Sequence, residues 1–215
     1  INFTGRHTME RQMQRSKVTQ GIYQIGSIRG TSSHQQNPFG ILCERNASET
    51  YGDCYGLSFL YSGNFVIEVE QDQFFQTRMA MGIHPHDFSF ILESEQEFIA
   101  PEVVMSYSSC GFEKLSHNYH KIFRENLCRS NYINKRPPIL VNNWEATYFD
   151  FTGEKLIEIA KQAKNLGIEM LVMDDGWFGK RDDDNSGLGD WFVNEEKLGC
   201  SLSEFVNQIN EIGLK

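Results

Sequence analysis

The chain has 215 residues, of which 40% are hydrophobic and 13% aromatic, as is typical of a folded globular protein with one or two domains. Its formal net charge of −9 disfavours nucleic acid and anionic membrane surfaces as partners. No stretch approaches the roughly 18 consecutive apolar residues of a membrane-spanning helix.

The cysteines are odd in number and irregularly spaced, and no two of them form a Cys-x-x-Cys pair. This usage indicates a reduced, cytosolic protein more than a disulfide framework. The five cysteines are Cys43, Cys54, Cys110, Cys128 and Cys200.

Residues 1 to about 110 consist of short segments that are typical of antiparallel β structure. Polar and apolar residues alternate in 21–30 and again in 65–70. Regular strand and turn spacing of this kind predicts a β-sandwich, incomplete at its N-terminus. The other predicted strands are residues 55–61, 74–80, 88–92 and 101–108.

A helical pattern follows, with Leu115, Tyr119 and Ile122 on one stripe. We interpret residues 115–135 as a linker helix that joins two domains. The first domain, residues 1–114, is part of an N-terminal β-sandwich. The second, residues 136–215, is the start of an α/β domain, since prolines 137 and 138 suit a boundary there.

Two short apolar runs in the second domain, 139–141 and 171–173, predict strands of a parallel sheet. The segment from Gly153 to Gly167 between them predicts a helix that ends at Gly167. Its expected inner face is Leu156, Ile159, Ala160, Ala163 and Leu166.

A final helix is expected with Ser203 as its N-terminal cap. Its predicted apolar side carries Phe205, Val206, Ile209 and Ile212. Two strand–helix units neither close a barrel nor complete an open sheet. We therefore expect a fragment that is aggregation-prone and inactive in isolation, because a strand edge and an apolar face would be exposed.

Polar clusters follow both strands of the second domain, where chemistry gathers in parallel α/β folds. The first is residues 142–145, Asn-Asn-Trp-Glu, and the second is Asp174 and Asp175. A tryptophan can stack on a pyranose while carboxylates accept hydrogen bonds from vicinal hydroxyls, which predicts a sugar-binding corner. The aspartates could instead cap the next loop or pair with Lys180 and Arg181.

The three tryptophans and Glu145 also have structural interpretations. Trp144 and Trp191 could be buried core aromatics, and Trp177 is expected to pack against the core. Glu145 could line the site or hold a neighbouring loop. The loop from Asp182 imitates part of a calcium site, but it has Val193 where glutamate is needed, so no metal site is predicted.

Six ordered blocks of this sequence resemble the bacterial α-galactosidases of glycoside hydrolase family 36, the melibiase and raffinase type. Together they cover nearly the whole chain and are far more specific than an isolated Asp-Asp pair. The blocks are residues 29–35, 61–65, 98–102, 142–149, 174–181 and 189–192.

The resemblance implies a multi-domain β plus α/β protein: an antiparallel β-sandwich followed by the first two βα units of a (β/α)8 TIM barrel. It implies a retaining glycoside hydrolase that removes terminal α-galactose from melibiose- or raffinose-type sugars. Trp144, Asp174 and Asp175 are then substrate-binding residues, and Glu145 and Trp191 are possible pocket-lining residues. The family also implies a cytoplasmic bacterial homotetramer. No metal or organic cofactor is implied, because two carboxylates and a water suffice.

In that family the nucleophile is an aspartate in a Lys-x-Asp motif on a later strand, and the acid/base aspartate lies further on. We therefore expect both catalytic residues beyond Lys215 and none within this chain. Two alternatives stay open: an α-N-acetylgalactosaminidase of the same family, or a non-catalytic carbohydrate-binding remnant.

Overall fold

The computed structural model describes all 215 residues, Ile1 to Lys215. They form two compact units, Ile1–Arg129 and Ser130–Lys215. The first unit is built from antiparallel strands, and the second begins with a parallel strand pair and its helices, as predicted. None of the helices is long and apolar enough to cross a membrane.

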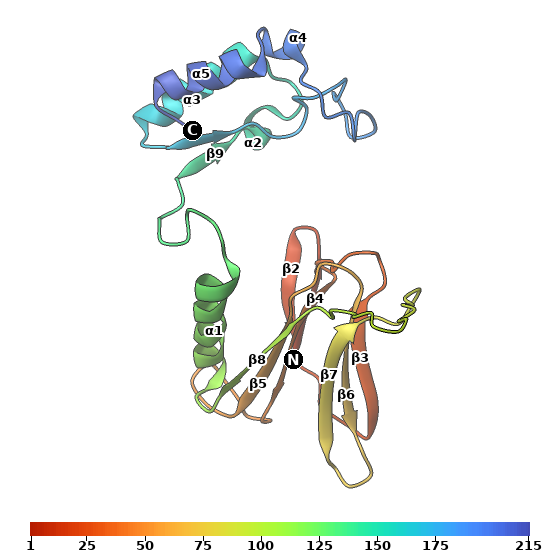
Figure 1. Cartoon of the computed structure of the whole chain (residues 1–215). Coiled ribbons are helices and arrows are strands. Elements are labelled where there is room, and N and C mark those ends of the chain that lie inside the picture. The colour runs from red at the N-terminus through yellow and green to blue at the C-terminus, as the bar shows by residue number, and fades with distance from the viewer. The chain divides into compact units, whose positions relative to one another are not determined.

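The first unit contains eight strands in two antiparallel sheets (Figure 1). One sheet has the order β2-β1-β4-β5-β8, and the other has the order β3-β6-β7. The strands are β1 Asn2–Arg6, β2 Met9–Gln14, β3 Gly21–Ser27, β4 Gln36–Cys43, β5 Cys54–Phe59, β6 Phe65–Gln71, β7 Thr77–Ile83 and β8 Val103–Ser108.

The two sheets share an apolar core, which confirms the predicted sandwich. Phe65 and Ile67 of β6 are buried together with Phe59 of β5. Their alternation along β6 puts every second side chain into the core, because successive residues of a strand face opposite sides.

The helix predicted as a linker belongs to the first unit. Helix α1 spans Gly111–Ile122 and continues as a π-helical turn, Phe123–Leu127. Leu115 and Tyr119 are buried against the five-stranded sheet. Helix α1 can lie close to β5 because the strand has Gly56 opposite Tyr119. A Cβ atom at Gly56 would lie only 2.8 Å from the tyrosine ring. The unit boundary therefore falls after Arg129, and not at residues 114 and 135.

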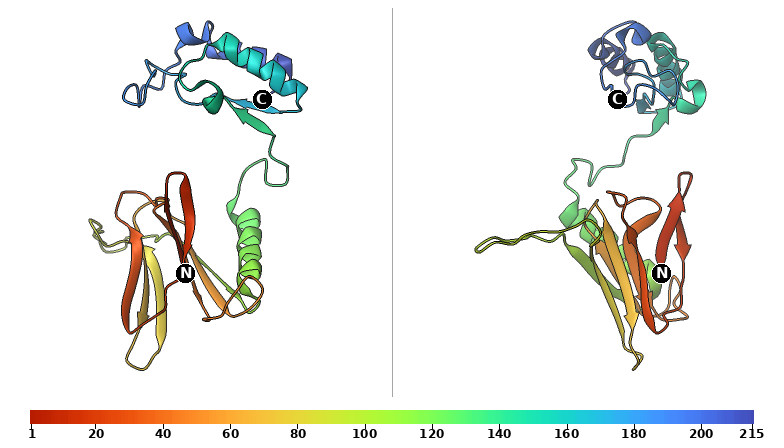
Figure 2. Two further views of the ribbon diagram at one scale, coloured as in Figure 1. Left: turned by 180° about the vertical axis from the view of Figure 1, so that it is seen from behind. Right: turned by 90° about the vertical axis from the view of Figure 1, so that its right-hand side faces the viewer.

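The predicted strand at 88–92 does not form, because no neighbouring strand pairs with this segment. Residues 84–102 instead project from the sandwich as an extended arm (Figure 2). Within the arm, Phe98 packs on Phe88 and Phe90 at ring-centroid distances of 5.8 and 4.8 Å. The predicted strand at 74–80 is also displaced, since Phe74 and Phe75 lie exposed in the turn before β7.

The second unit begins with β9, Leu140–Asn142, and β10, Met170–Val172, which pair in parallel with Val172 opposite Asn142. Helices α2, Trp144–Thr147, and α3, Gly153–Asn165, follow β9. Helices α4, Glu195–Leu198, and α5, Leu202–Ile212, follow β10. These elements are the two predicted strand–helix units.

Helices α3 and α5 pack together around a single core. Leu156, Ala160 and Ala163 of α3 are buried, as predicted, whereas Leu166 is 83% exposed. The prediction that Leu166 faces the core is wrong. Leu166 is the C-terminal cap of α3, where the backbone leaves the helical path, so helical spacing no longer sets its direction. The other core members are Phe151, Leu198, Phe205, Ile209 and Leu214.

The cap of α5 is Ser201 and not Ser203. Ser201 and Glu204 form a capping box: the Glu204 N–H donates to Ser201 Oγ over 3.3 Å, and the Ser201 N–H donates to Glu204 Oε2 over 3.0 Å. Phe205 and Ile209 of α5 are buried, whereas Val206 of the expected apolar side is exposed, because adjacent residues of a helix point about 100° apart.

Two leucines of α3 provide a matched test of this core. Leu156→Ala should lower the free energy of unfolding by about 3 kcal/mol, because it leaves a cavity in a closed core. Leu166→Ala should change it by less than about 0.5 kcal/mol, because that side chain is in water. Urea unfolding of both variants measures the difference, and equal losses would contradict this description of the core.

Candidate functional site

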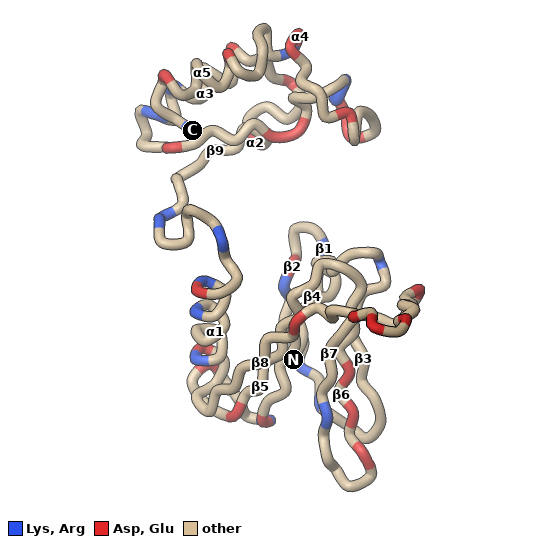
Figure 3. Tube along the Cα trace, in the orientation of Figure 1, with Lys and Arg blue, Asp and Glu red and all other residues tan.

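The parallel pairing of β9 and β10 brings the two predicted polar clusters together. Asn142 ends β9, and Asp174 follows β10 by two residues. The side-chain amide of Asn142 donates a hydrogen bond to Asp174 Oδ2. Figure 3 shows acidic residues beside α2 and in the neighbouring loop. The prediction that both clusters share one edge of the sheet is confirmed.

A buried asparagine connects the two strand ends. The Asn143 side chain is fully buried; its Oδ1 accepts from the Asp174 backbone N–H over 2.8 Å. Its Nδ2 donates to Thr147 Oγ1 of α2, also over 2.8 Å. Asn143 therefore fixes the start of the Asp174 turn relative to β9. The sequence showed Asn143 only as part of a motif, and nothing in its neighbours distinguished it from the exposed Asn142.

The Asp174 carboxylate keeps unused hydrogen-bonding capacity. Its Oδ1 accepts from the Asp175 N–H over 2.7 Å, and its Oδ2 accepts from Asn142. An ionised carboxylate has about four acceptor positions. Two positions of Asp174 are therefore left for a ligand.

The Asp175 carboxylate is held by Arg181. Arg181 Nε donates to Asp175 Oδ1 over 2.9 Å, and Nη2 donates to Oδ2 over 2.7 Å, so the pair is bidentate. The Gly176 N–H adds a bond of 2.8 Å to Oδ1. The Arg181 side chain is 6% exposed and that of Asp175 is 26% exposed. The hydrogen bonds from Arg181 hold the pKa of Asp175 below its ordinary value.

The pairing with Arg181 is the structural interpretation considered for the aspartates, and it holds for Asp175 but not for Asp174. Lys180 has no part in it: Arg181 alone turns inward. Arg181 Nη1 also donates to the Ser186 carbonyl over 2.7 Å. Its guanidinium lies over the Phe149 ring, 5.5 Å from the centroid.

Gly176 allows the chain to turn sharply between the aspartates and the loop. Its φ is +95°, a conformation that other residues rarely adopt. A Cβ atom there would also lie 3.1 Å from the Phe149 ring and 3.2 Å from the Arg181 carbonyl. The glycine therefore permits the close approach of Phe149 and Arg181 to the aspartate turn.

Trp144 is the first residue of α2, and its indole is half-buried rather than lost in the core. Its backbone N–H donates to Asn142 Oδ1 over 2.8 Å. Two rings meet the indole at nearly right angles: Tyr148 at 5.3 Å and Phe149 at 4.9 Å between centroids. Phe149 thus contacts both Trp144 and Arg181, and it was not a sequence candidate.

The two possible pocket residues differ. Glu145 is exposed and accepts from the Tyr148 hydroxyl over 3.3 Å, which favours a role in holding the neighbouring turn. Trp191 is 67% exposed and packs on Phe178 at 4.5 Å. A buried core position for Trp191 is therefore wrong, and its contact with a ligand stays a prediction. Trp177 packs against the core, as expected.

One Lys-x-Asp sequence, Lys180-Arg181-Asp182, lies close to this site. Asp182 is in the exposed loop and not at a strand end, and it pairs with Lys197 over 3.1 Å. It therefore does not match a nucleophile carried on a later strand. No group of three or more His, Cys, Asp or Glu side chains is placed to hold a metal ion.

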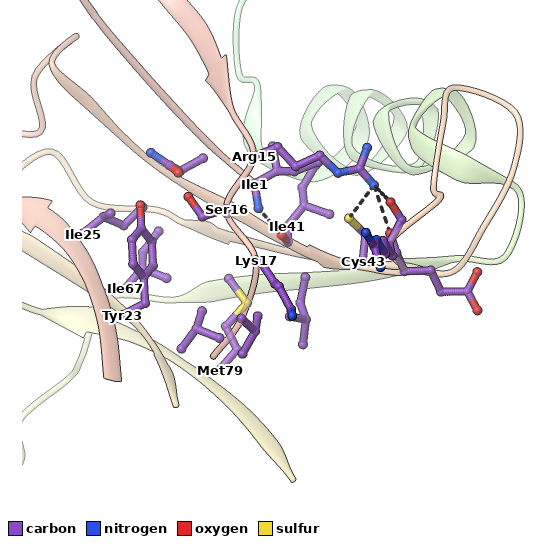
Figure 4. Close-up of a pocket in the computed structure, with 17 residues that line it drawn as sticks. Ile1, Arg15, Ser16, Lys17, Tyr23, Ile25, Ile41, Cys43, Ile67 and Met79 are labelled. Atoms are coloured by element: carbon purple, nitrogen blue, oxygen red, sulfur yellow. Dashed lines mark hydrogen bonds between the residues drawn. The ribbon is translucent and has the colours of Figure 1, made fainter. Parts of the chain in front are cut away.

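A separate cavity of about 390 Å³ lies between the sheets of the first unit (Figure 4). Ile25, Ile67 and Met79 line it with apolar groups. Arg15 lies at its edge, but the guanidinium donates to the carbonyls of Ala47, Glu44 and Arg45 at 2.8–3.0 Å. These bonds engage the Arg15 guanidinium, and most of the surface that lines the cavity is apolar.

Comparison with known families accounts for both units. The Glycosyl hydrolase family 36 N-terminal domain matches residues 1–93, and the Melibiase family matches residues 97–215. The chain belongs to the melibiase family, glycoside hydrolase family 36.

Several curated melibiase-family proteins align with the whole chain. The bifunctional α-galactosidase/sucrose kinase AgaSK of Mediterraneibacter gnavus is 53% identical over 215 residues, which are 23% of its length. The α-galactosidase AgaA of Geobacillus stearothermophilus is 49% identical, over 30% of its length. The chain thus spans less than a third of these relatives.

Solved melibiase-family structures share the fold. The galactosidase domain of AgaSK matches with a TM-score of 0.95 and 53% identity, over the whole chain and 30% of that domain. An AgaA variant solved in complex with raffinose matches with a TM-score of 0.95 and 48% identity, again over 30% of its chain. These matches confirm the sandwich and the first barrel units as the fold.

Removal of the buried side-chain amide of Asn143 should lower the stability of the folded second unit. Asn143→Ala leaves the Asp174 N–H without its acceptor and removes one donor to Thr147 Oγ1, and it should lower the free energy of unfolding by about 1–3 kcal/mol. Asn142→Ala removes an exposed side chain and should cost less. Thermal unfolding compares the two variants, and equal stability of both would contradict a structural role for Asn143.

The Asp175–Arg181 pair should also make stability depend on pH. Because the folded-state pKa of Asp175 is lowered, its stabilisation is present above the ordinary value of about 3.9 and is lost as pH falls through the lower folded value. Asp175→Asn should therefore be less stable than wild type at pH 7, and this difference in stability should shrink towards pH 3. Other charged side chains near the pair are Lys197, Asp183 and Asp184.

The matched control for this pH series is Asp184→Asn, because Asp184 is exposed and only 4.0 Å from Arg181. It should follow the wild-type unfolding midpoint at every pH. A constant difference between wild type and Asp175→Asn from pH 7 to pH 3 would exclude the ionised pair as the cause.

Proposed function

We propose that the protein containing this chain is an α-galactosidase. It hydrolyses terminal, non-reducing α-D-galactose residues of melibiose- and raffinose-type galactosides with retention of configuration, by double displacement. The observation that carries the proposal is the ordered match of both parts of the chain to glycoside hydrolase family 36. Relatives named α-galactosidase align over all 215 residues, and AgaA has been solved in complexes with stachyose and raffinose.

The residues at the strand ends supply substrate binding in this proposal. Asp174 has two open acceptor positions, which suit two neighbouring sugar hydroxyls. Trp144 is half-buried beside them and offers apolar surface to a pyranose ring. Asp175 is an additional acceptor at the same turn, and Glu145 and Trp191 are possible outer contacts.

Bond cleavage is assigned to carboxylates outside these 215 residues. A retaining glycosidase needs a nucleophile and an acid/base, with carboxyl groups about 5–5.5 Å apart. Asp175 is a poor general acid, because Arg181 favours its ionised form and lowers its pKa. Asp174 is already oriented by two donors as a hydrogen-bond acceptor.

The setting of the enzyme forms part of the proposal. We expect a bacterial cytoplasmic protein, which agrees with five free cysteines and no disulfide. A homotetramer agrees with the exposed apolar side chains of the arm, which offer surface for subunit contacts. The net charge of −9 does not favour nucleic acid or anionic membranes. Neither a metal nor an organic cofactor is required by the reaction.

The test is to express the longest reading frame that contains these residues and to assay 4-nitrophenyl α-D-galactoside. Asp174→Ala should lower kcat/KM by more than about 100-fold, because it removes charged acceptors of two hydrogen bonds. Trp144→Ala should lower it by about tenfold or more through lost stacking. Lys180→Ala is the matched control, since Lys180 is exposed beside the site, and it should retain full activity.

The alternatives predict different results in the same assay. Turnover of only the α-N-acetylgalactosaminide would replace the proposal with an α-N-acetylgalactosaminidase. No turnover of either substrate, with galactose still binding by calorimetry, would indicate a non-catalytic carbohydrate-binding protein. For an active enzyme, NMR of the first-formed sugar must show the α-anomer of galactose, since the β-anomer would contradict retention.

A further inference from the structure

We propose that Arg181 is a positioning residue for substrate recognition: it fixes the Asp175 carboxylate and leaves that carboxylate a single acceptor position, on Oδ2, for one sugar hydroxyl. This inference rests on the proposed function. It goes further by giving the two adjacent aspartates unequal tasks and by assigning a role to a residue that touches no substrate.

The count of hydrogen bonds gives the single position. Asp175 Oδ1 accepts from the Gly176 N–H and from Arg181 Nε, which fills both of its lone pairs. Oδ2 accepts from Arg181 Nη2, and the 3.1 Å contact from Nε shares a proton already counted. One lone pair of Asp175 remains, whereas Asp174 keeps two acceptor positions.

The surroundings of Arg181 fix its guanidinium so that it can hold the Asp175 carboxylate. Its side chain is 6% exposed, so water has little access to compete for the hydrogen bonds of the guanidinium. The Ser186 carbonyl accepts from Nη1, and the Phe149 ring lies against its face. A guanidinium held by the Ser186 carbonyl and the Phe149 ring presents its fork to Asp175 in one orientation, which a lysine could not reproduce.

The same ring joins Arg181 to the proposed stacking surface. Phe149 meets Trp144 at 89° between ring planes and lies under the guanidinium of Arg181. The apolar and the charged parts of the site are thus built on one shared side chain. Movement of Arg181 would alter the Asp175 carboxylate directly and would disturb Trp144 only through Phe149.

The experiment uses the enzyme from the longest reading frame and compares 4-nitrophenyl α-D-galactoside with its 2-, 3-, 4- and 6-deoxy analogues. For each preparation the ratio of kcat/KM between parent and analogue is measured. This ratio does not depend on the folded fraction, because both substrates meet the same molecules. Wild-type enzyme inactive on the parent would contradict the proposed function itself, before any question about Arg181 arises.

Arg181→Lys keeps the charge and loses the fork. It should lower the parent-to-analogue ratio by about tenfold or more for one deoxy position, as for a lost hydrogen bond to a charged group. The ratios at the positions read by Asp174 should change by less than about threefold. Asp184→Asn removes an exposed carboxylate 4.0 Å from Arg181, leaves the Asp175 pair intact and should leave all ratios unchanged.

A double-mutant cycle tests whether Arg181 acts through Asp175. In the Asp175→Asn background, Arg181→Lys should have no further effect on the affected ratio. Equal ratios in wild type and Arg181→Lys, or full additivity in the double variant, would overturn the proposal. If Arg181→Lys yields no soluble enzyme, Arg181→Gln, which is shorter and neutral but keeps an amide N–H donor near the position of Nε, enters the same cycle and is judged by the same two outcomes.

Discussion

The hydrogen bonds of one buried side chain, Asn143, set the geometry of the strand ends in the second unit. Parallel pairing places β9 beside β10, but two three-residue strands share few backbone hydrogen bonds. Asn143 adds a bond to the Asp174 N–H and one to Thr147. The asparagine therefore links both strands and α2 just where the polar residues begin.

The two aspartates are next to each other in sequence but have different surroundings. Asp174 receives hydrogen bonds from a side-chain amide and a backbone N–H, and it keeps room for neutral hydroxyls. The negative charge of Asp175 is balanced by the guanidinium of Arg181. Asp175 therefore holds the loop that carries Arg181 as well as contributing to the site. Two neighbouring negative charges are tolerated because one of them is neutralised from behind by Arg181.

Patterns of regular structure were readable from the sequence. The alternation in 65–70 and the helical spacing of Leu156, Ala160 and Ala163 predicted elements that the structure contains. Leu166 was misplaced because it lies at a helix terminus. Val206 was assigned to the apolar side of α5, but it points about 100° away from the buried Phe205 and is exposed. The apolar segment 88–92 has strand-like composition, but a strand also needs a partner, which local sequence does not reveal.

Candidate site residues were predictable where a strand end placed them together. Asp174, Asp175 and Trp144 all lie near the carboxyl edge of the parallel pair. Asn143 and Phe149 were missed as organising residues because their importance lies in contacts across the loop, whereas Arg181 was considered from the sequence as a partner of the aspartates. Asn143 and the exposed Asn142 are identical in type and adjacent in sequence, so only burial distinguishes them.

The position of Phe149 between Trp144 and Arg181 has a consequence for how such a site could change during evolution or redesign. One aromatic ring supports the indole on one side and the guanidinium on the other. A substitution that reshapes the apolar surface for a bulkier sugar would thus also release the arginine. New specificity would require two replacements, one that reshapes the apolar surface and one that holds the arginine again. The first replacement alone would weaken substrate recognition, and the second would restore it. Such coupling slows divergence at these positions and makes libraries that vary them together more productive than single-site scans.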